Sequence, residues 1–371
     1  MKYIMILSDS NMSLTFETAK FMFMELSQTF ASEGDRCEFF QWLKEEVVPE
    51  YERSAGDSGK DLPTSASIER IAADIRARLP LEAVLPSETI VYPTVGEDSS
   101  LSAVNSVHVD AFLYDETAEE ALVQEGSLQR SYCKDCGSRN IDDLTFTTHS
   151  CSKERLEFIF SGLLPPLEGK TVIDIGSRVG AVLYGAFYYS EATKIIGIEI
   201  NSDLCKLQKE VVETFKLGER ISVVEGDMCS MEDLVRSGDV IVLNNVFEWF
   251  MAPELQIKMW QFLKQTLKTG SMLVTIPSLK SSLEHLDTGI DLGSWVAPLE
   301  MHNKEWEDSG VETSEICLYK INTSGNPPRK RSIESCCDEQ VDGDHKIVNQ
   351  NGNKPPSDSK PPKKKQKSNT D

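Results

Sequence analysis

The chain of 371 residues has no apolar run that approaches the ~20 consecutive residues needed to cross a bilayer. Its first apolar run, residues 3–7, is shorter than the apolar region of a signal peptide. Nine cysteines are too few for a disulfide-stabilised scaffold of this length. These absences predict a folded protein that stays inside the cell, has no membrane partner, and keeps its cysteines as free thiols or metal ligands.

Basic residues are also scarce, and they are distributed unevenly. The chain has 38 Lys and Arg against 60 Asp and Glu, a net charge of −22. Residues 325–371 hold 10 basic and 7 acidic residues, a balance of +3, so the preceding part carries −25. Because so acidic a body repels a phosphate backbone, a protein is favoured over a nucleic acid as the partner or substrate.

The composition divides the chain into four regions. Residues 1–130 contain recurring aromatic and aliphatic residues and predict a mainly helical region, with helices at 67–79 and near 117–124. A loop with Cys and His occupies 131–151, and a regular region covers 152–324. Residues 325–371 are rich in Asn, Ser, Pro, Lys and Asp and predict a disordered tail, since they have too few large apolar residues to bury.

The regular region alternates short apolar strands with helices. The pattern predicts strands at 171–175, 194–200, 221–225, 239–243 and 271–276, with helices before, between and after them. A later strand is expected at 315–321 as one member of an antiparallel pair. Strands separated by helices of this length imply an α/β fold with a mainly parallel sheet and helices on both faces.

A glycine turn follows the first of these strands. An acid, Asp174, stands two residues before Gly176, and Gly180 follows after three further residues. Such a turn lets a ligand approach the backbone and directs the N–H groups of the next helix towards it. The spacing differs from the Gly-x-Gly-x-x-Gly pattern of dinucleotide sites.

The turn resembles the acid-x-Gly-x-Gly-x-Gly signature of class I, Rossmann-like S-adenosylmethionine-dependent methyltransferases, with Arg178 in place of the middle glycine. The resemblance covers residues 152–279 and implies S-adenosyl-L-methionine as the cofactor. It implies that Asp174 organises the methionine end and that the carboxylate of Glu199 accepts the ribose hydroxyls. Asp227 would meet the adenine amino group, and Met228 the adenine ring. The full predicted cofactor set is Asp174, Gly176, Ser177, Gly180, Glu199, Asp227, Met228 and Asn244.

The same resemblance places the acceptor pocket at Asn244 and Asn245, after the fourth strand, with Phe247, Trp249 and Phe250 as candidate walls. No prolines follow the Asn pair, which disfavours methylation of adenine or glutamine amino groups. The Asn pair and the upstream turn are also similar to non-SET histone-lysine methyltransferases linked to telomeric silencing, one alternative function. The other alternative is a catalytically inactive adaptor with the methyltransferase fold, in which Arg178 fills the site.

Two further patterns suggest partners. Cys133 and Cys136 resemble half a zinc knuckle, and His149 with Cys151 would complete four ligands for zinc. In the competing interpretation the cysteines are ordinary thiols and His149 belongs to a loop near the cofactor. In the tail, Arg329-Lys330-Arg331 and Lys363-Lys364-Lys365 follow proline pairs and predict recognition by the nuclear import machinery and a nuclear or nucleo-cytoplasmic location, the alternative being a solubilising tail.

Overall fold

The computed structural model describes residues 23, 26, 27, 29–47, 63–135, 139–299, 311 and 313–322. Cys136 and the two basic clusters predicted for nuclear import lie outside the described residues. No helix within the described ranges is long and apolar enough to span a membrane.

One seven-stranded sheet dominates the fold, in the strand order β10-β11-β9-β8-β5-β6-β7. β5 to β9 run parallel to one another, and β11 runs antiparallel to both of its neighbours, β9 and β10. The strands are β5 (Thr171–Ile175), β6 (Lys194–Glu199), β7 (Ile221–Glu225), β8 (Val240–Asn244), β9 (Met272–Ile276), β10 (Val296–Pro298) and β11 (Cys317–Ile321). The mainly parallel α/β sheet predicted from the sequence is confirmed, including the late antiparallel strand.

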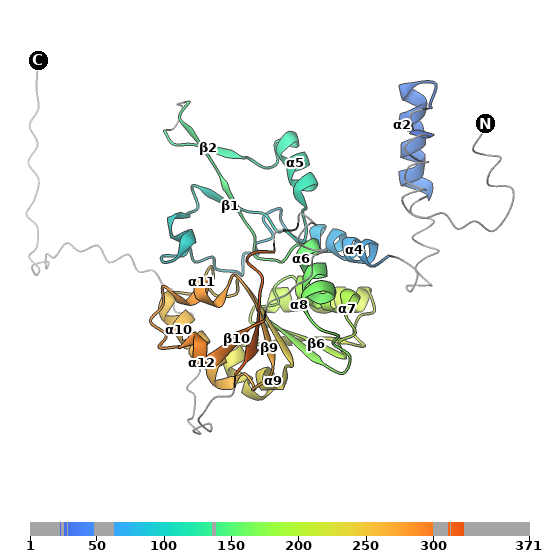
Figure 1. Ribbon diagram of the computed structural model, residues 1–371. Coiled ribbons are helices and arrows are strands. Elements are labelled where there is room, and N and C mark those ends of the chain that lie inside the picture. Colours follow the sequence, from blue (N-terminus) through green and yellow to red (C-terminus); the bar gives the residue numbers. More distant parts are fainter. Residues whose placement is uncertain are drawn as a thin grey trace, which may run out of the picture.

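Helices cover both faces of this sheet (Figure 1). One face packs against α4 (Thr64–Arg76), α6 (Lys153–Glu157), the π-helix η3 (Phe158–Leu163), α7 (Ala181–Tyr189) and α8 (Ser202–Thr214). The other packs against α9 (Glu232–Ser237), α10 (Pro253–Thr266), α11 (Leu279–Leu283) and α12 (Leu292–Trp295). The helix expected before the first strand of the sheet is divided into two parts, since α6 is followed directly by the π-helix η3.

Period-two alternation within the strands creates the two apolar layers. In β8, Val240 and Val242 belong to the layer under α7 and α8, whereas Ile241 and Leu243 belong to the layer under α10. All four are buried. Because both faces are covered by helices, residues 240–243 of β8 are all apolar instead of alternating with polar residues.

The N-terminal helix α4 is part of the same core. Its apolar residues Ile68, Ile71, Ala72 and Ile75 recur at one-turn spacing and are fully buried in the layer that also holds α7 and α8. Burial of an Ile side chain stabilises a fold by about 1.5–3 kcal/mol, so this helix is firmly attached to the sheet domain.

The other described elements lie outside the main sheet. They are α2 (Glu33–Trp42), the π-helix η1 (Leu43–Val47), α5 (Glu116–Glu125), and the one-turn helices η2 (Glu97–Ser100) and η4 (Met228–Ser230). β1 (Ser106–His108) pairs in parallel with β4 (Thr145–Thr147), and β2 (Ser131–Cys133) forms a hairpin with β3 (Ile141–Asp143). Residues 77–96 and 101–105 contain neither helix nor strand, and residues 87–89 and 91–96 line cavities at the carboxyl ends of the sheet strands.

Candidate functional site

The strand order reverses between β5 and β8, which creates a crevice at the carboxyl ends of these strands. A cavity of about 460 Å³, here called the main cavity, lies there. This volume falls within the range of about 300–1,000 Å³ usual for small-molecule sites. The ends of β5, β6, β7 and β8 supply Ile175, Gly176, Ile198, Glu199, Gly226, Asp227, Met228, Asn244 and Asn245, and residues 87–89 close one side.

The glycine turn forms part of the floor. Gly176 has φ +73°, and a Cβ there would lie 2.2 Å from Cγ2 of Val246, so glycine is required at this position. Ser177 and Gly180 do not line the cavity. Ser177 Oγ donates to Gln208 Oε1 at 2.8 Å, and Gln208 Nε2 donates to the Arg178 carbonyl at 2.7 Å. The hydrogen bonds of Ser177 and Gln208 therefore support the glycine turn without contributing to the cavity wall.

Glu199 stands at the end of β6 with its carboxylate held by backbone groups. Oε2 accepts from the N–H of Arg178 at 2.9 Å, and Oε1 accepts from the N–H of Asn201 at 2.8 Å. Burial raises the pKa of Glu199, and these hydrogen bonds oppose the rise. Each oxygen keeps a further lone pair, so the carboxylate can still accept two hydroxyl groups from a ligand in the cavity.

At the end of β7, Asp227 has one satisfied and one unsatisfied oxygen. Oδ1 accepts from the Cys229 N–H at 2.9 Å, whereas Oδ2 is buried and has no hydrogen-bond partner among the described residues. Buried polar atoms normally have a hydrogen-bond partner, so Oδ2 is suited to accept a hydrogen bond from a ligand in the cavity. Met228 beside it is buried and apolar, and Ile200 is 53% exposed on the cavity wall. This combination suits a flat ring that carries an amino group.

Asp174 lies one residue before the end of β5 and is 3% exposed. Burial raises its pKa to about 8, and the charge of Glu199 adds to the rise. Its side chain is not among those that line the main cavity. The role of Asp174 at the methionine end of a cofactor therefore stays a prediction.

Arg178 adopts the left-handed conformation, φ +46°, that suits the glycine it replaces. Its side chain is buried and faces the irregular N-terminal segment. Nε donates to Glu88 at 3.1 Å, Nη1 donates to Asp110 at 2.9 Å, and Nη2 donates to the carbonyl of Ala83. All three residues, Arg178, Glu88 and Asp110, have side chains at most 7% exposed. Arg178 thus ties residues 83–110 to the glycine turn, and each of its three guanidinium nitrogens donates a hydrogen bond.

A second cavity of about 270 Å³, here called the side cavity, adjoins the main cavity. Asn244, Asn245 and Met251 line both, so the two predicted acceptor residues stand where the cavities meet. Asn244 Nδ2 donates to the carbonyl of His149 at 3.4 Å. Asn245 has φ +47°, a conformation that Asn tolerates better than most residues.

His149 lies beside this junction in an aromatic cluster. Its ring packs against those of His108, Trp249 and Phe250 at centroid distances of 4.9, 5.6 and 5.1 Å. Its Nε2 lies 2.9 Å from His108 Nδ1. Burial, then the charges of Arg178 and His108, lower the pKa of His149 to about 2, so the ring is neutral.

The zinc site predicted from four Cys and His residues is not supported. Cys133 is exposed on the β2–β3 hairpin, and its thiol donates to the Asp135 carbonyl at 2.7 Å. His149 is buried among aromatic rings, and burial raises the pKa of Cys151 to about 12. In the part of the chain that the structure describes, which excludes Cys136, no three His, Cys, Asp or Glu side chains form a metal-binding group. Sequence spacing could not show that the hairpin and His149 occupy different environments.

Other wall residues were not predicted from the sequence. Glu88 and its neighbours come from a segment without regular structure, and Met259 comes from the middle of α10. The position of Ile200, directly after the strand-ending acid Glu199, is a signal that could have identified it.

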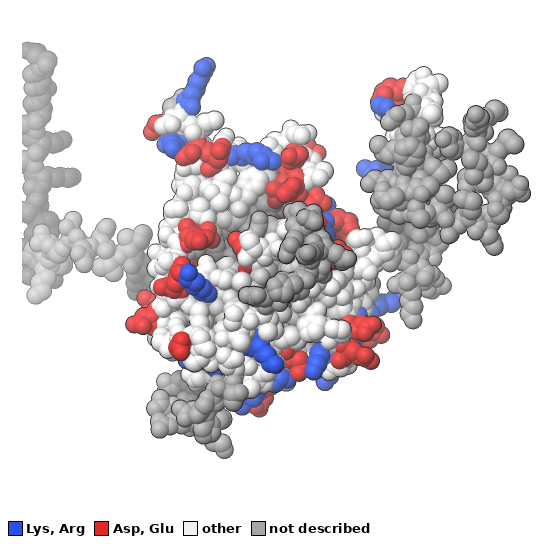
Figure 2. Space-filling view, in the orientation of Figure 1, with Lys and Arg blue, Asp and Glu red and all other residues white. Residues whose placement is uncertain are grey.

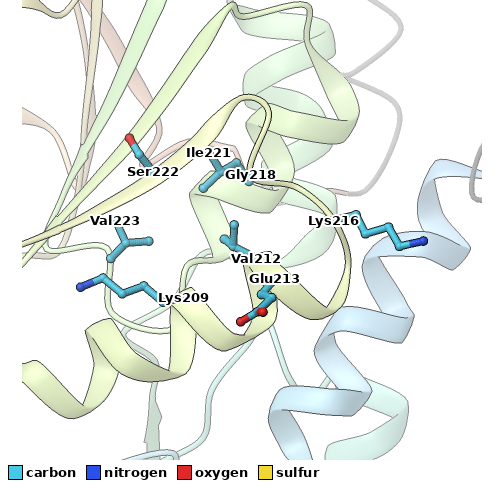
Figure 3. Close-up of a pocket in the computed structure, with 8 residues that line it drawn as sticks. All are labelled: Lys209, Val212, Glu213, Lys216, Gly218, Ile221, Ser222 and Val223. Atoms are coloured by element: carbon cyan, nitrogen blue, oxygen red, sulfur yellow. The ribbon is translucent and has the colours of Figure 1, made fainter.

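A different hollow of about 480 Å³ lies between α8 and the edge strand β7 (Figure 3). It contains none of the predicted site residues: its wall consists of Lys209, Val212, Glu213, Lys216, Gly218, Ile221, Ser222 and Val223.

No protein-family model and no curated protein matches the sequence. Among solved structures, an RNA methyltransferase from Salinibacter ruber in complex with S-adenosyl-L-homocysteine is 17% identical, covers 49% of this chain and 97% of its own, and has a TM-score of 0.32. An S-adenosylmethionine-dependent O-methyltransferase from Thermotoga maritima is 18% identical over 50% of this chain and 69% of its own, with a TM-score of 0.35. A precorrin-6y C5,15-methyltransferase from Geobacter metallireducens is 15% identical over 47% and 91%, with a TM-score of 0.32.

The observed sheet, mainly parallel with β11 antiparallel beside β9 and with helices on both faces, agrees with the Rossmann-like α/β sheet expected from the sequence.

Proposed function

We propose that this chain is an S-adenosylmethionine-dependent methyltransferase whose cofactor binds in the main cavity. The observation that supports this most is the pair of strand-end carboxylates facing one cavity. Glu199 has lone pairs left for hydroxyl groups, and the buried Oδ2 of Asp227 lacks a donor. A nucleoside offers both, since it has ribose hydroxyls at one end and an adenine amino group at the other.

The residues present fit this cofactor. Glu199 would hold the ribose, Asp227 and Met228 the adenine, and Gly176 leaves the glycine turn open to a ligand. The bound cofactor supplies an activated methyl group on a sulfonium. The contribution of the chain is then to orient the acceptor towards that group and to exclude water.

An active enzyme is favoured over an inactive adaptor because of the position of Arg178. The adaptor interpretation assumed that this side chain fills the site. Its guanidinium is instead engaged by Glu88, Asp110 and a carbonyl group, and a cavity of about 460 Å³ remains.

The acceptor proposed here is a protein, and a nuclear one if the basic clusters of residues 325–371 direct import. Acidic side chains gather over α5 on the face shown in Figure 2, in keeping with the charge of −25 that precedes the tail. Such a surface disfavours nucleic acid. The related alternative, a histone-lysine-type acceptor, is one case of a protein acceptor.

Calorimetric titration with S-adenosylmethionine tests the proposal. Glu199→Gln should weaken binding by roughly 1.5–3 kcal/mol, the usual worth of hydrogen bonds to a charged group. Asp227→Asn should weaken it as well, because Asp227 accepts a hydrogen bond from the cofactor. Glu225→Gln is the matched control, since Glu225 also ends a strand but does not line the cavity. Absence of binding to the wild-type protein, or equal affinity for all variants, would contradict the proposal.

A further inference from the structure

The side cavity has walls from several separate parts of the chain. Residues 91–98 form one side, and the start of α10, α11 and the end of β9 form the other sides. It meets the main cavity at Asn244, Asn245 and Met251. A group that enters the side cavity would therefore approach a ligand of the main cavity from the β8 side.

The walls are held in place by contacts between the N-terminal segment and the loop after β8. The Val91 N–H donates to the Trp249 carbonyl at 2.8 Å, and Trp249 Nε1 donates to Asp98 Oδ2 at 3.1 Å. Tyr92 packs edge-on against the Trp249 ring at 5.4 Å. The cavity is thus a built feature of the fold, with aromatic and hydrogen-bonded support.

Negative charge dominates the described lining of the side cavity. It holds the acids Glu97, Asp98, Glu248 and Glu315, against Arg155 and His285. His285 lies 3.3 Å from Glu284. Arg155 is paired with Glu315 at 3.1 Å. Neither Glu97 nor Glu248 has a cationic partner among the described residues, so two carboxylates are left to attract a cation.

Size restricts what that cation can be. A volume of about 270 Å³ lies just under the usual lower limit of about 300 Å³ for pockets that enclose a whole drug-sized ligand. It accommodates an alkyl chain with a charged end. A phosphate-bearing acceptor would meet like charge at Glu97, Asp98 and Glu248.

From the charge and the position of this cavity, we infer that the side cavity binds an alkylammonium group and presents its nitrogen for methylation, an inference that rests on the proposed function. The ammonium first loses one proton to water. The amine nitrogen then forms a bond to the methyl carbon while the carbon–sulfur bond breaks and its electron pair goes to sulfur. The product is again a cation, which the same carboxylates hold.

Two substitutions and one control test this inference. Glu97→Gln and Glu248→Gln each remove one unpaired carboxylate of the side cavity. Glu254→Gln removes the same charge from an exposed residue in the first turn of α10 that does not line it. The acceptors are a short peptide with a single lysine, the same peptide with glutamine in its place, n-butylamine, a phenol and an oligonucleotide, each with tritiated S-adenosylmethionine.

We expect label in the lysine peptide or n-butylamine and in none of the other acceptors. Label in the peptide alone identifies a protein lysine, whereas label in n-butylamine identifies a small amine. The KM for the amine should rise about three- to fivefold in each Gln variant, the upper range for exposed charge pairs, with kcat and cofactor affinity unchanged. Glu254→Gln should behave as the wild type.

A second readout needs no turnover. Saturation-transfer NMR of n-butylamine with the full chain, without cofactor, should show binding that weakens with added salt and disappears in the Glu97→Gln/Glu248→Gln double variant. No binding, or equal binding to the double variant, overturns the inference. Label in the phenol or the oligonucleotide also overturns it and leaves the proposed function intact. A protein that binds no S-adenosylmethionine overturns the proposed function instead, while the NMR result still decides whether the side cavity binds amines.

Discussion

Arg178→Gly restores the glycine that the resembling signature has at this position, and yet we predict that it destabilises the protein. The guanidinium is buried and neutralises Glu88 and Asp110, which lie 90 and 68 residues away along the chain. With glycine at position 178, both carboxylates stay buried without a cation.

The size of the effect follows from two opposing contributions. Loss of one partner from a buried ion pair costs about 3–5 kcal/mol. Glycine relieves the left-handed conformation of Arg178, φ +46°, which is worth about 1 kcal/mol. The net loss in the free energy of unfolding is therefore roughly 2–4 kcal/mol. For a domain of this size each kcal/mol lowers the Tm by about 2–4 °C, so the expected fall is about 5–15 °C.

Thermal unfolding followed by circular dichroism measures this fall. Adding Glu88→Gln and Asp110→Asn to Arg178→Gly should restore part of the lost stability, because the unpaired charges are then gone. Arg78→Ala is the control, since Arg78 pairs with Asp74 and Glu210 at the surface and should contribute at most about 1 kcal/mol. An Arg178→Gly protein as stable as the wild type would refute the assigned role of Arg178.

Three other predictions concern single features. Burial raises the pKa of Asp174 to about 8, above its usual value near 4, so the native state binds more protons than the unfolded state and the wild type loses stability as pH rises from about 4 to 8. Asp174→Asn should therefore gain in Tm relative to the wild type over that pH range. Parallel pH profiles of the two proteins would contradict this. Asn245→Gly should keep the stability of the wild type, whereas Asn245→Ala should lose about 1 kcal/mol of unfolding free energy because position 245 has φ +47°. Both variants should slow methyl transfer. A Gly variant as unstable as the Ala variant would show that the backbone conformation does not explain the Asn at this position. Deletion of residues 325–371 should leave the Tm and the cofactor affinity unchanged. It should also remove the protein from the nucleus, which fluorescence microscopy of a tagged protein can show. A truncated protein that remains nuclear would favour the solubilising role of the tail.

Much of the sheet domain could be predicted from sequence because its signals are local. Short runs rich in β-branched and aliphatic residues between helices define the strands, and the observed bounds of β5 and β7 agree with those predicted. The helix predicted at 67–79 is also present, as α4, although it begins and ends three residues earlier, at Thr64 and Arg76. The glycine turn and the acids at strand ends indicated which edge of the sheet forms the site.

The remaining features depend on contacts between distant residues that no periodicity records. The partners of Arg178 lie in a segment without regular structure, so the sequence could not show whether its side chain fills the site or supports it. Spacing offered His149 either as a zinc ligand or as a loop residue near the cofactor. The fold buries it against His108 and Trp249, on the wall of the main cavity. The side cavity is formed by residues 91–98 lying over α10 and α11, a long-range arrangement that only the structure reveals.

The central claim is that Glu199 and Asp227 bind the two ends of one nucleoside in the main cavity. A crystal structure of the full chain grown with S-adenosyl-L-homocysteine tests it most directly. The account predicts density in the main cavity, with ribose hydroxyls at Glu199 and the adenine amino group at Asp227 Oδ2. Density for the ligand elsewhere, for example in the hollow between α8 and β7, or a ligand that contacts neither carboxylate, would contradict it.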